Sequence, residues 1–425
     1  MNVTPLSQEL LQSVVDGMPD DGLADTRREA AAKFATMGFP AVGQEDWKYT
    51  NLAGVAELSD TWLRGNPDTI TSADGDATEI IAEVTGSIDA AWIVVRDGIV
   101  DPNLPQPRGI TIERVSAIDD AEVGGDDPLS VFNAALLRDG LRIIASAEAA
   151  PDIPLGILFL DDPANAVAQN RVIVEAGTNS RFQVIEYSAS ASAGRQFTNT
   201  VSELHLAQGS RVDHVRVQVR DREHAGVNRV TATLAADAEF HHNSFDLGGS
   251  LTRNDVITDI AGKGATVNLN GLYLASGEQH IDNHTGILHK VGPASSNEEY
   301  RGIISGRSRC VFNGKVVVSE GADGTDSSQS NHNLLLSDRA EIDTKPELEI
   351  YADDVKCAHG ATVGQLDETA LFYLRSRGLD SDQARQVLTR AFAAGTLAEL
   401  AIEACHDRLA ELLDSRLEAL VGEKG

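Results

Sequence analysis

A loose repeat of short apolar runs extends through the middle of the chain, from about residue 140 to residue 365. Alternation of apolar and polar positions predicts strands, and recurrence about every 20–50 residues predicts a solenoid. Because no helical crossover separates the runs, we expect a mainly β chain that folds as a parallel β-helix. The copies are unevenly spaced, which leaves a two-sheet sandwich as the alternative. They begin with turn residues at Gly177, Gly209, Asp237, Gly264, Arg307, Asp338 and Gly360.

The segment before this β region is predicted to be helical and mixed. Residues 1–40 carry Leu and Val at intervals of three and four, which favours helices. The segment 45–52 (EDWKYTNL) holds two aromatic residues in a short polar stretch, and we expect it to anchor the N-terminal arm to the body. Residues 91–100 indicate a hairpin turned at an Asp-Gly pair. The acidic stretch 117–131 is predicted to be a linker, so the N-terminal region is assigned to 1–130.

The segment after the β region, assigned to 366–425, is predicted to be helical and follows a solenoid core over 131–365. Asp367 can cap a first helix that ends at Gly378. Asp380 or the following Ser can cap a second helix, and a third is expected from about Leu397 to Val421. We expect the apolar faces of these helices to pack on a partner or on each other.

The charge balance excludes several kinds of partner. The chain has 35 Lys and Arg against 65 Asp and Glu, a formal net charge of −30. It therefore lacks the basic excess that a nucleic-acid binder or a protein docked on an anionic membrane needs. No apolar run is long enough to span a bilayer, and the first basic residue is Arg27, which disfavours a secretory signal. Three widely spaced cysteines make no disulfide framework, so we expect a cytoplasmic protein.

The most informative stretch for chemistry is 345–365, KPELEIYADDVKCAHGATVGQ. Residues two apart share one face of a strand, so Cys357 and His359 are expected to point the same way. A thiolate beside an imidazole suits a soft metal. Two ligands do not complete an iron–sulfur or zinc site, so any others would come from elsewhere in the chain or from a partner. By pattern alone, a structural strand end is an equal alternative.

A second polar cluster lies at His280, Asp282 and His284, which share a strand face by the same parity. We interpret it as a polar ladder on the outside of the solenoid, with a metal site as the alternative. The adjacent pair at 241–242 straddles both faces of a strand and is a weaker candidate. Two cysteines are predicted to be buried: Cys310 beside Val311 and Phe312, and Cys405 on the apolar seam of the last helix.

Several catalytic motifs are absent from the sequence, among them the P-loop, the GxSxG elbow, HExxH and CxxC. A β-helix enzyme that acts on polysaccharide would need an aromatic groove. Aromatic residues make up only 5% of the chain, and Trp47, Trp62 and Trp92 all precede the β region. A self-contained metalloprotein built on His280 and His284 is a further alternative.

The run 343–378 (DTKPELEIYADDVKCAHGATVGQLDETALFYLRSRG) strongly resembles the SufB/SufD family of iron–sulfur cluster assembly proteins. The segments 312–318 and 330–346 and the aromatic stretch 45–52 fit the same family. The motif KCAHGATVG favours its SufD members, with SufB as the close rival. The resemblance implies a right-handed parallel β-helix flanked by helical regions. It also implies a non-catalytic scaffold subunit in the cytoplasm.

In such a complex the chain would pair with SufB through the end of its β-helix and bind the ATPase SufC through its C-terminal helices. Cys357 and His359 would lie at the SufB interface and contribute to iron acquisition and the nascent cluster. Reduced flavin is associated with the complex, and an isolated chain could form a homodimer. The expected SufC-binding residues are Asp367, Leu371, Phe372, Tyr373, Leu374, Leu388 and Phe392.

Overall fold

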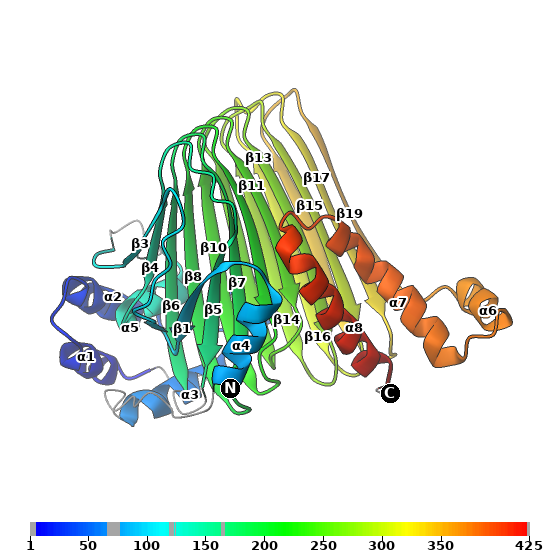
Figure 1. Ribbon diagram of the computed structural model, residues 1–425, viewed down its shortest axis with the longest axis horizontal. Coiled ribbons are helices and arrows are strands. Elements are labelled where there is room, and N and C mark those ends of the chain that lie inside the picture. The colour runs from blue at the N-terminus through cyan, green and yellow to red at the C-terminus, as the bar shows by residue number, and fades with distance from the viewer. Residues whose placement is uncertain (1–5, 66–76, 119–122, 124, 163–165, 423–425) are drawn as a thin grey trace.

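Two long sheets run side by side through the computed structural model, which describes residues 6–65, 77–118, 123, 125–162 and 166–422 (Figure 1). From β4 (Leu141–Ala145) onward successive strands alternate between the two sheets, so each of these strands pairs in parallel with strands two places away along the chain. This alternation is the winding of a parallel β-helix, and the sandwich alternative is wrong. The repeat shows the reason: Val212, Phe240 and Val267 occupy equivalent places in three of its copies, are direct register partners on three neighbouring strands, and stack in the core.

The ten-stranded sheet ends with β2 at one edge and β19 at the other. In chain order its strands are β1 (Ala91–Arg96), β2 (Ile99–Val100), β5 (Leu155–Asp161), β7 (Arg181–Ser190), β9 (Arg211–Gln218), β11 (Glu239–Asp246), β13 (Thr266–Ala275), β15 (Ser295–Ile304), β17 (Asp326–Leu335) and β19 (Lys356–Gly364). The β1–β2 pair is antiparallel and turns at Asp97 and Gly98, both with positive φ, which confirms the predicted hairpin.

The nine-stranded sheet ends with β3 at one edge and β18 at the other. Its strands are β3 (Ile110–Arg114), β4 (Leu141–Ala145), β6 (Val167–Ala176), β8 (Gln196–Leu206), β10 (His224–Leu234), β12 (Leu251–Ile260), β14 (His280–His289), β16 (Arg309–Val318) and β18 (Glu341–Ile350). The edge strand β3 is antiparallel to β4. The strands β1, β2 and β3, which precede residue 131, therefore belong to the two sheets of the solenoid.

Helices cover the outer faces of both sheets (Figure 1). The N-terminal helices α1 (Gln8–Gly17), α2 (Ala24–Met37), α3 (Ala53–Arg64) and α5 (Pro128–Leu136) form one apolar cluster with residues of the nine-stranded sheet. On the ten-stranded sheet, α4 (Thr78–Ser87), α7 (Ser381–Ala398) and α8 (His406–Gly422) do the same. A third cluster fills the space between the sheets. The short 3-10 helices are η1 (Glu45–Trp47) and η3 (Glu403–Cys405), and α6 spans Glu368–Ser376.

Two sequence interpretations need correction. The predicted linker contains the start of α5, whose residues Leu129–Leu136 are buried against the nine-stranded sheet. The amide of Asn133 also donates to backbone carbonyl oxygens of β6 and β8. The third C-terminal helix begins at His406, since α7 continues to Ala398. The apolar faces of α7 and α8 pack on the sheet of their own chain as well as on each other.

The aromatic segment 45–52 anchors the N-terminal arm, as the sequence predicted. Trp47 is buried, and the guanidinium of Arg253 lies 4.6 Å from its ring centroid. The same guanidinium donates to the carbonyl oxygen of Asp46 at 2.9 Å and to the Asp282 carboxylate at 2.6 Å. Thr50 donates to Asp282 as well. Within the described parts of the chain, no helix is long and apolar enough to cross a membrane.

Candidate interfacial site at the open end of the solenoid

The last turn of the solenoid is left uncovered at its outer edge. Among the described strands, β18 pairs only with β16 and β19 only with β17, so one backbone edge of each has no strand partner. Exposed apolar side chains lie on these two strands and next to them, at Ile350, Tyr351 and Val363. An unpaired edge with apolar side chains is a template for pairing with another chain. This end therefore has the character of an interaction surface.

Cys357 and His359 both point toward the interior of the solenoid at this end. In the parallel register their partners on β17 are Ser327 and Gln329, whose side chains are buried between the sheets. Because side chains at partnered positions lie on the same face, the two β19 residues continue that interior column. Cys357 packs against the interior cluster and is half-buried, while His359 is exposed. The structure thus confirms the shared face that the alternation predicted.

The pair is incomplete as a metal site within this chain. No group of three or more His, Cys, Asp or Glu side chains suited to a metal occurs in the described ranges. Burial, and next the nearby Asp326 carboxylate, raise the pKa of the Cys357 thiol. The thiol therefore stays protonated near neutral pH, and a metal or a cationic group would be needed to bring out the thiolate.

A polar lining lies directly beneath this pair in the preceding turns. The Gln329 amide donates to the Glu298 carboxylate at 2.7 Å, and both side chains are buried. Ser327 Oγ lies 2.9 Å from Ser296 Oγ, which lies 2.9 Å from His289 Nε2. Burial raises the pKa of Glu298 to about 7 and lowers that of His289 to about 4. Two titratable side chains with shifted pKa values therefore lie buried inside the solenoid near its open end.

Sequence reasoning did not assign these lining residues to the site. Glu298 and Gln329, like Ser296 and Ser327, are 31 residues apart in the chain, and the strand register brings each pair together. His289 reaches Ser296 from the opposite sheet. The available signal was parity: Ser296, Glu298 and the buried Tyr300 alternate on one strand, so Glu298 had to share the interior face.

The cluster at His280, Asp282 and His284 belongs to the anchor of the N-terminal arm. His280 Nε2 lies 2.8 Å from Thr50 Oγ1, and His284 Nε2 lies 3.0 Å from Asp282 Oδ1. Since Arg253 already neutralises the buried Asp282 carboxylate, the group is a polar cluster on the outer sheet face, in agreement with the ladder interpretation. The pair at 241–242 straddles the strand, with His242 inside and 3.1 Å from His214. Cys310 and Cys405 are buried, as predicted.

The C-terminal helices separate the predicted partner-binding residues into two groups. Helix α6 projects from the body of the molecule (Figure 1), where Phe372 is 72% exposed and Tyr373 is 56% exposed. Asp367 caps this helix through the Thr369 N–H. Leu371 is buried, and Leu374 and Leu388 are half-buried. Phe392 packs against the ten-stranded sheet with the Arg301 guanidinium 5.4 Å from its ring centroid, so it anchors α7 rather than facing solvent.

Comparisons with known proteins agree with this architecture. Residues 159–392 match the family model described as SUF system FeS cluster assembly, SufBD core domain. The solenoid with the open end and the incomplete Cys–His pair is therefore the fold of an iron–sulfur cluster assembly protein. The chain belongs to the SufBD family. It is 30% identical to the iron–sulfur cluster assembly protein SufD of Escherichia coli over 89% of this chain and 90% of that one.

Two further relatives span different shares of the chain. A SufBD family protein of Synechocystis is 27% identical over 95% of this chain and 93% of its own length. The SufD protein of Bacillus subtilis is 25% identical over 68% of this chain and 67% of its own length. The chain is thus an assembly-family protein along most of its length.

Proposed function

We propose that this chain is a non-catalytic, SufD-like scaffold subunit that supports iron acquisition and cluster formation together with a SufB-like paralogue and the ATPase SufC. The observation that carries the proposal is the open end of the solenoid, where two unpaired strand edges flank Cys357 and His359. The family match also covers SufB proteins, and a SufB-like role is the alternative.

Pairing with a paralogue supplies what this end lacks. A second β-helix could continue both sheets across the interface, since parallel edges with free N–H and C=O groups favour addition of strands. The partner would then supply ligands beside Cys357 and His359 and complete the three or four that a cluster needs. The iron and the nascent cluster are cargo of this shared site. In the absence of the paralogue, two copies of the chain are proposed to meet through the same surface.

The ATPase is proposed to dock on α6 and the adjoining part of α7. Phe372 and Tyr373 are large exposed apolar side chains on a helix that makes few contacts with the solenoid, and such residues are common at interface centres. Leu371 on the same helix is buried, and the half-buried Phe392 packs against the ten-stranded sheet, so both are proposed to support this surface. We also propose that the complex uses reduced flavin, with no residue of this chain assigned to that cofactor. The complex is proposed to lie in the cytoplasm.

The first test is purification of the tagged full-length chain from its own cells without oxygen, followed by mass spectrometry and iron analysis. We expect a SufB-like paralogue, a SufC-like ATPase and bound iron. His359→Ala should lower the iron content while leaving both partners bound, and the exposed outer His205→Ala is the matched control. A chain that elutes alone and without iron contradicts the shared-site function.

The second test separates the two surfaces. The double variant Phe372→Ala, Tyr373→Ala should lose the ATPase and retain the paralogue, because α6 projects from the body of the molecule (Figure 1) and the paralogue is proposed to bind the strand edges of β18 and β19. Ile153→Ala, an exposed apolar residue elsewhere on the surface, should retain both. Loss of both partners in the double variant, or of neither, would assign the ATPase to a different surface.

A further inference from the structure

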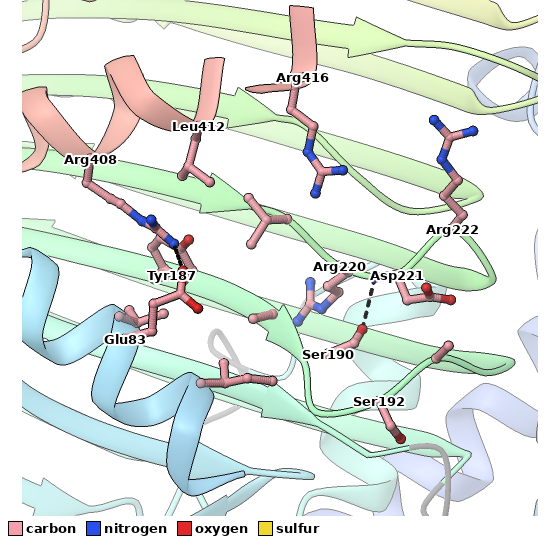
Figure 2. Close-up of a pocket in the computed structure, with 15 residues that line it drawn as sticks. Glu83, Tyr187, Ser190, Ser192, Arg220, Asp221, Arg222, Arg408, Leu412 and Arg416 are labelled. Carbon is pink, nitrogen blue, oxygen red and sulfur yellow. Dashed lines mark hydrogen bonds and ion pairs between the residues drawn. The ribbon is translucent and has the colours of Figure 1, made fainter. Parts of the chain in front are cut away.

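A cavity of about 400 Å³ lies between α4, α8 and the outer face of the ten-stranded sheet (Figure 2). It opens beside the carboxyl ends of β7 and β9, far along the solenoid from the open end at β19. Its size falls within the range of about 300–1,000 Å³ that is usual for small-molecule sites. The cavity takes no part in the interfaces described above.

Arginine side chains from two separate parts of the chain line this cavity. They are Arg220 and Arg222, which follow β9, and Arg408 and Arg416, which lie on α8. The lining carboxylates are Glu83 and Asp221, and Glu83 is held by Arg408. In a chain with a net charge of −30 this local excess of positive charge is unusual. It cannot follow from composition, so the fold itself gathers these side chains.

Arg220 is the buried member of the group and is only partly satisfied. Its Nε donates to Asp161 at 2.6 Å, and both side chains are 1% exposed. The two terminal nitrogens, Nη1 and Nη2, are buried and have no hydrogen-bond partner in the part of the chain that the structure describes. Because they have almost no accessible surface and Nη1 lies near Gly226 of the opposite sheet, these nitrogens face the interior of the solenoid, and Arg220 contributes to the wall of the cavity without donating into it.

Arg416 lies half-buried on α8 and faces the same cavity. Across the described residues, no ion pair joins it to a carboxylate. Burial, and next the nearby Arg222, lower the pKa of its guanidinium. An anion in the cavity would offset both effects, since an opposite charge favours the charged form.

Hydroxyl groups and apolar side chains complete the lining. Ser190 Oγ accepts from the Asp221 N–H at 3.0 Å, which leaves its proton for another acceptor. Ser192 lies at the same rim, and Asp221 itself accepts from the backbone N–H of Glu223 at 3.0 Å. On the α4 and α8 side the walls are apolar, with Ile80, Val84 and Leu412.

We propose that this cavity binds a phosphorylated small molecule, with its phosphate on Arg416 and the Ser190 hydroxyl and its organic part against Leu412 and α4. Arginine is suited to phosphate because its planar guanidinium donates two parallel hydrogen bonds. The cavity has room for more than one phosphate. The strongly negative surface of the chain disfavours a nucleic-acid polymer.

Titration calorimetry on the full-length chain at constant ionic strength tests the proposal, with inorganic phosphate, pyrophosphate, AMP and adenosine as probes. We expect at least one phosphate-bearing probe to bind with a Kd in the millimolar range or below, and adenosine to bind at least about tenfold more weakly than AMP. Arg416→Gln should weaken the binding at least about tenfold, and Arg416→Lys by less. Arg339→Gln removes one exposed charge elsewhere and should leave the Kd unchanged.

Three outcomes would overturn the proposal: no heat with any phosphate-bearing probe, equal binding of AMP and adenosine, or an equal loss in Arg339→Gln and Arg416→Gln. Thermal unfolding of each variant without ligand shows that the native state is intact. Arg416 is used rather than Arg220 because loss of Arg220 would leave the buried Asp161 carboxylate without its cation. A ligand-induced rise in Tm that disappears in Arg416→Gln gives an independent readout.

Discussion

Replacing Arg253 with Met should release the N-terminal arm from the solenoid. The guanidinium is buried and bonds to Asp282, Asp255 and the Asp46 carbonyl oxygen. Burial alone would raise the pKa of Asp282, but the charge of Arg253 outweighs it and holds that pKa well below its usual range. Removing one partner of a buried ion pair costs about 3–5 kcal/mol. We expect Arg253→Met to lose a free energy of that order.

Native-state hydrogen exchange of the segment 45–52 is the assay, because it reports the local opening of the arm rather than unfolding of a large chain. A loss of about 3–5 kcal/mol corresponds to exchange roughly two to four orders of magnitude faster, up to the limit set by global unfolding. The matched control is Arg390→Met. The Arg390–Asp414 pair is 2.8 Å long but its side chains are 67% and 38% exposed, so we expect less than about 1 kcal/mol.

The pKa of Asp282 determines how the stability difference between the two proteins changes with pH. In the wild type the folded pKa of Asp282 is depressed, so its contribution to stability is present above the unfolded pKa of about 3.9 and is lost as the pH falls through the folded pKa. In Arg253→Met the folded pKa should instead be raised. The difference between the two proteins should therefore shrink as the pH is lowered toward 4. If Arg253→Met exchanged no faster than Arg390→Met, the anchor energetics argued here would be wrong.

Three further outcomes are expected. Burial raises the pKa of Glu298 to about 7, so wild-type stability should fall as pH rises from about 4.5 to 7 by an amount on the order of 3 kcal/mol; in urea unfolding curves Glu298→Gln should lack this slope, and an unchanged slope would refute it. Iodoacetamide at alkaline pH, where the raised thiol pKa of Cys357 still allows a thiolate, should label Cys357 in the native protein and label the buried Cys310 and Cys405 only after unfolding; mass spectrometry of native label at either buried site would contradict their burial. Leu413→Ala, in the cluster under α8, should cost about 2–5 kcal/mol in urea unfolding, and a cost below about 1 kcal/mol would show that α8 is loosely packed.

The strand pattern could be predicted from the sequence because each turn repeats the same alternation. Val212, Phe240 and Val267 occupy equivalent places in the repeat, and the register pairs them directly. The end of the second C-terminal helix could not be predicted in this way. The sequence pattern started the third helix near Leu397, yet α7 continues to Ala398. Within α7 the Arg301 guanidinium packs where a side chain at 395 would lie, so a glycine is needed there. The contact that explains this glycine comes from a distant strand.

Only the part of the candidate site that is formed by residues close together in the sequence could be predicted. Cys357 and His359 share a face by parity, and the sequence shows this without any knowledge of the neighbouring strands. Glu298 and Gln329 meet only because β15 and β17 are parallel and in register. The arginine cavity is similar, since Arg220 and Arg416 are almost two hundred residues apart in the chain. A local sequence pattern cannot predict contacts between residues so far apart in the chain. The winding of the solenoid brings these residues together.

The two ends of the solenoid differ in a way that limits the size of any assembly. At the N-terminal end the sheets finish in the short antiparallel strands β2 and β3, which do not present the parallel edge found at β18 and β19. A stack of β-helices joined end to end could grow without limit if both ends were alike. Among the described strands, β18 and β19 present the parallel edges suited to such growth, and a second chain that adds there covers these edges in both molecules. Strand addition therefore stops at a pair and does not lead to a fibre.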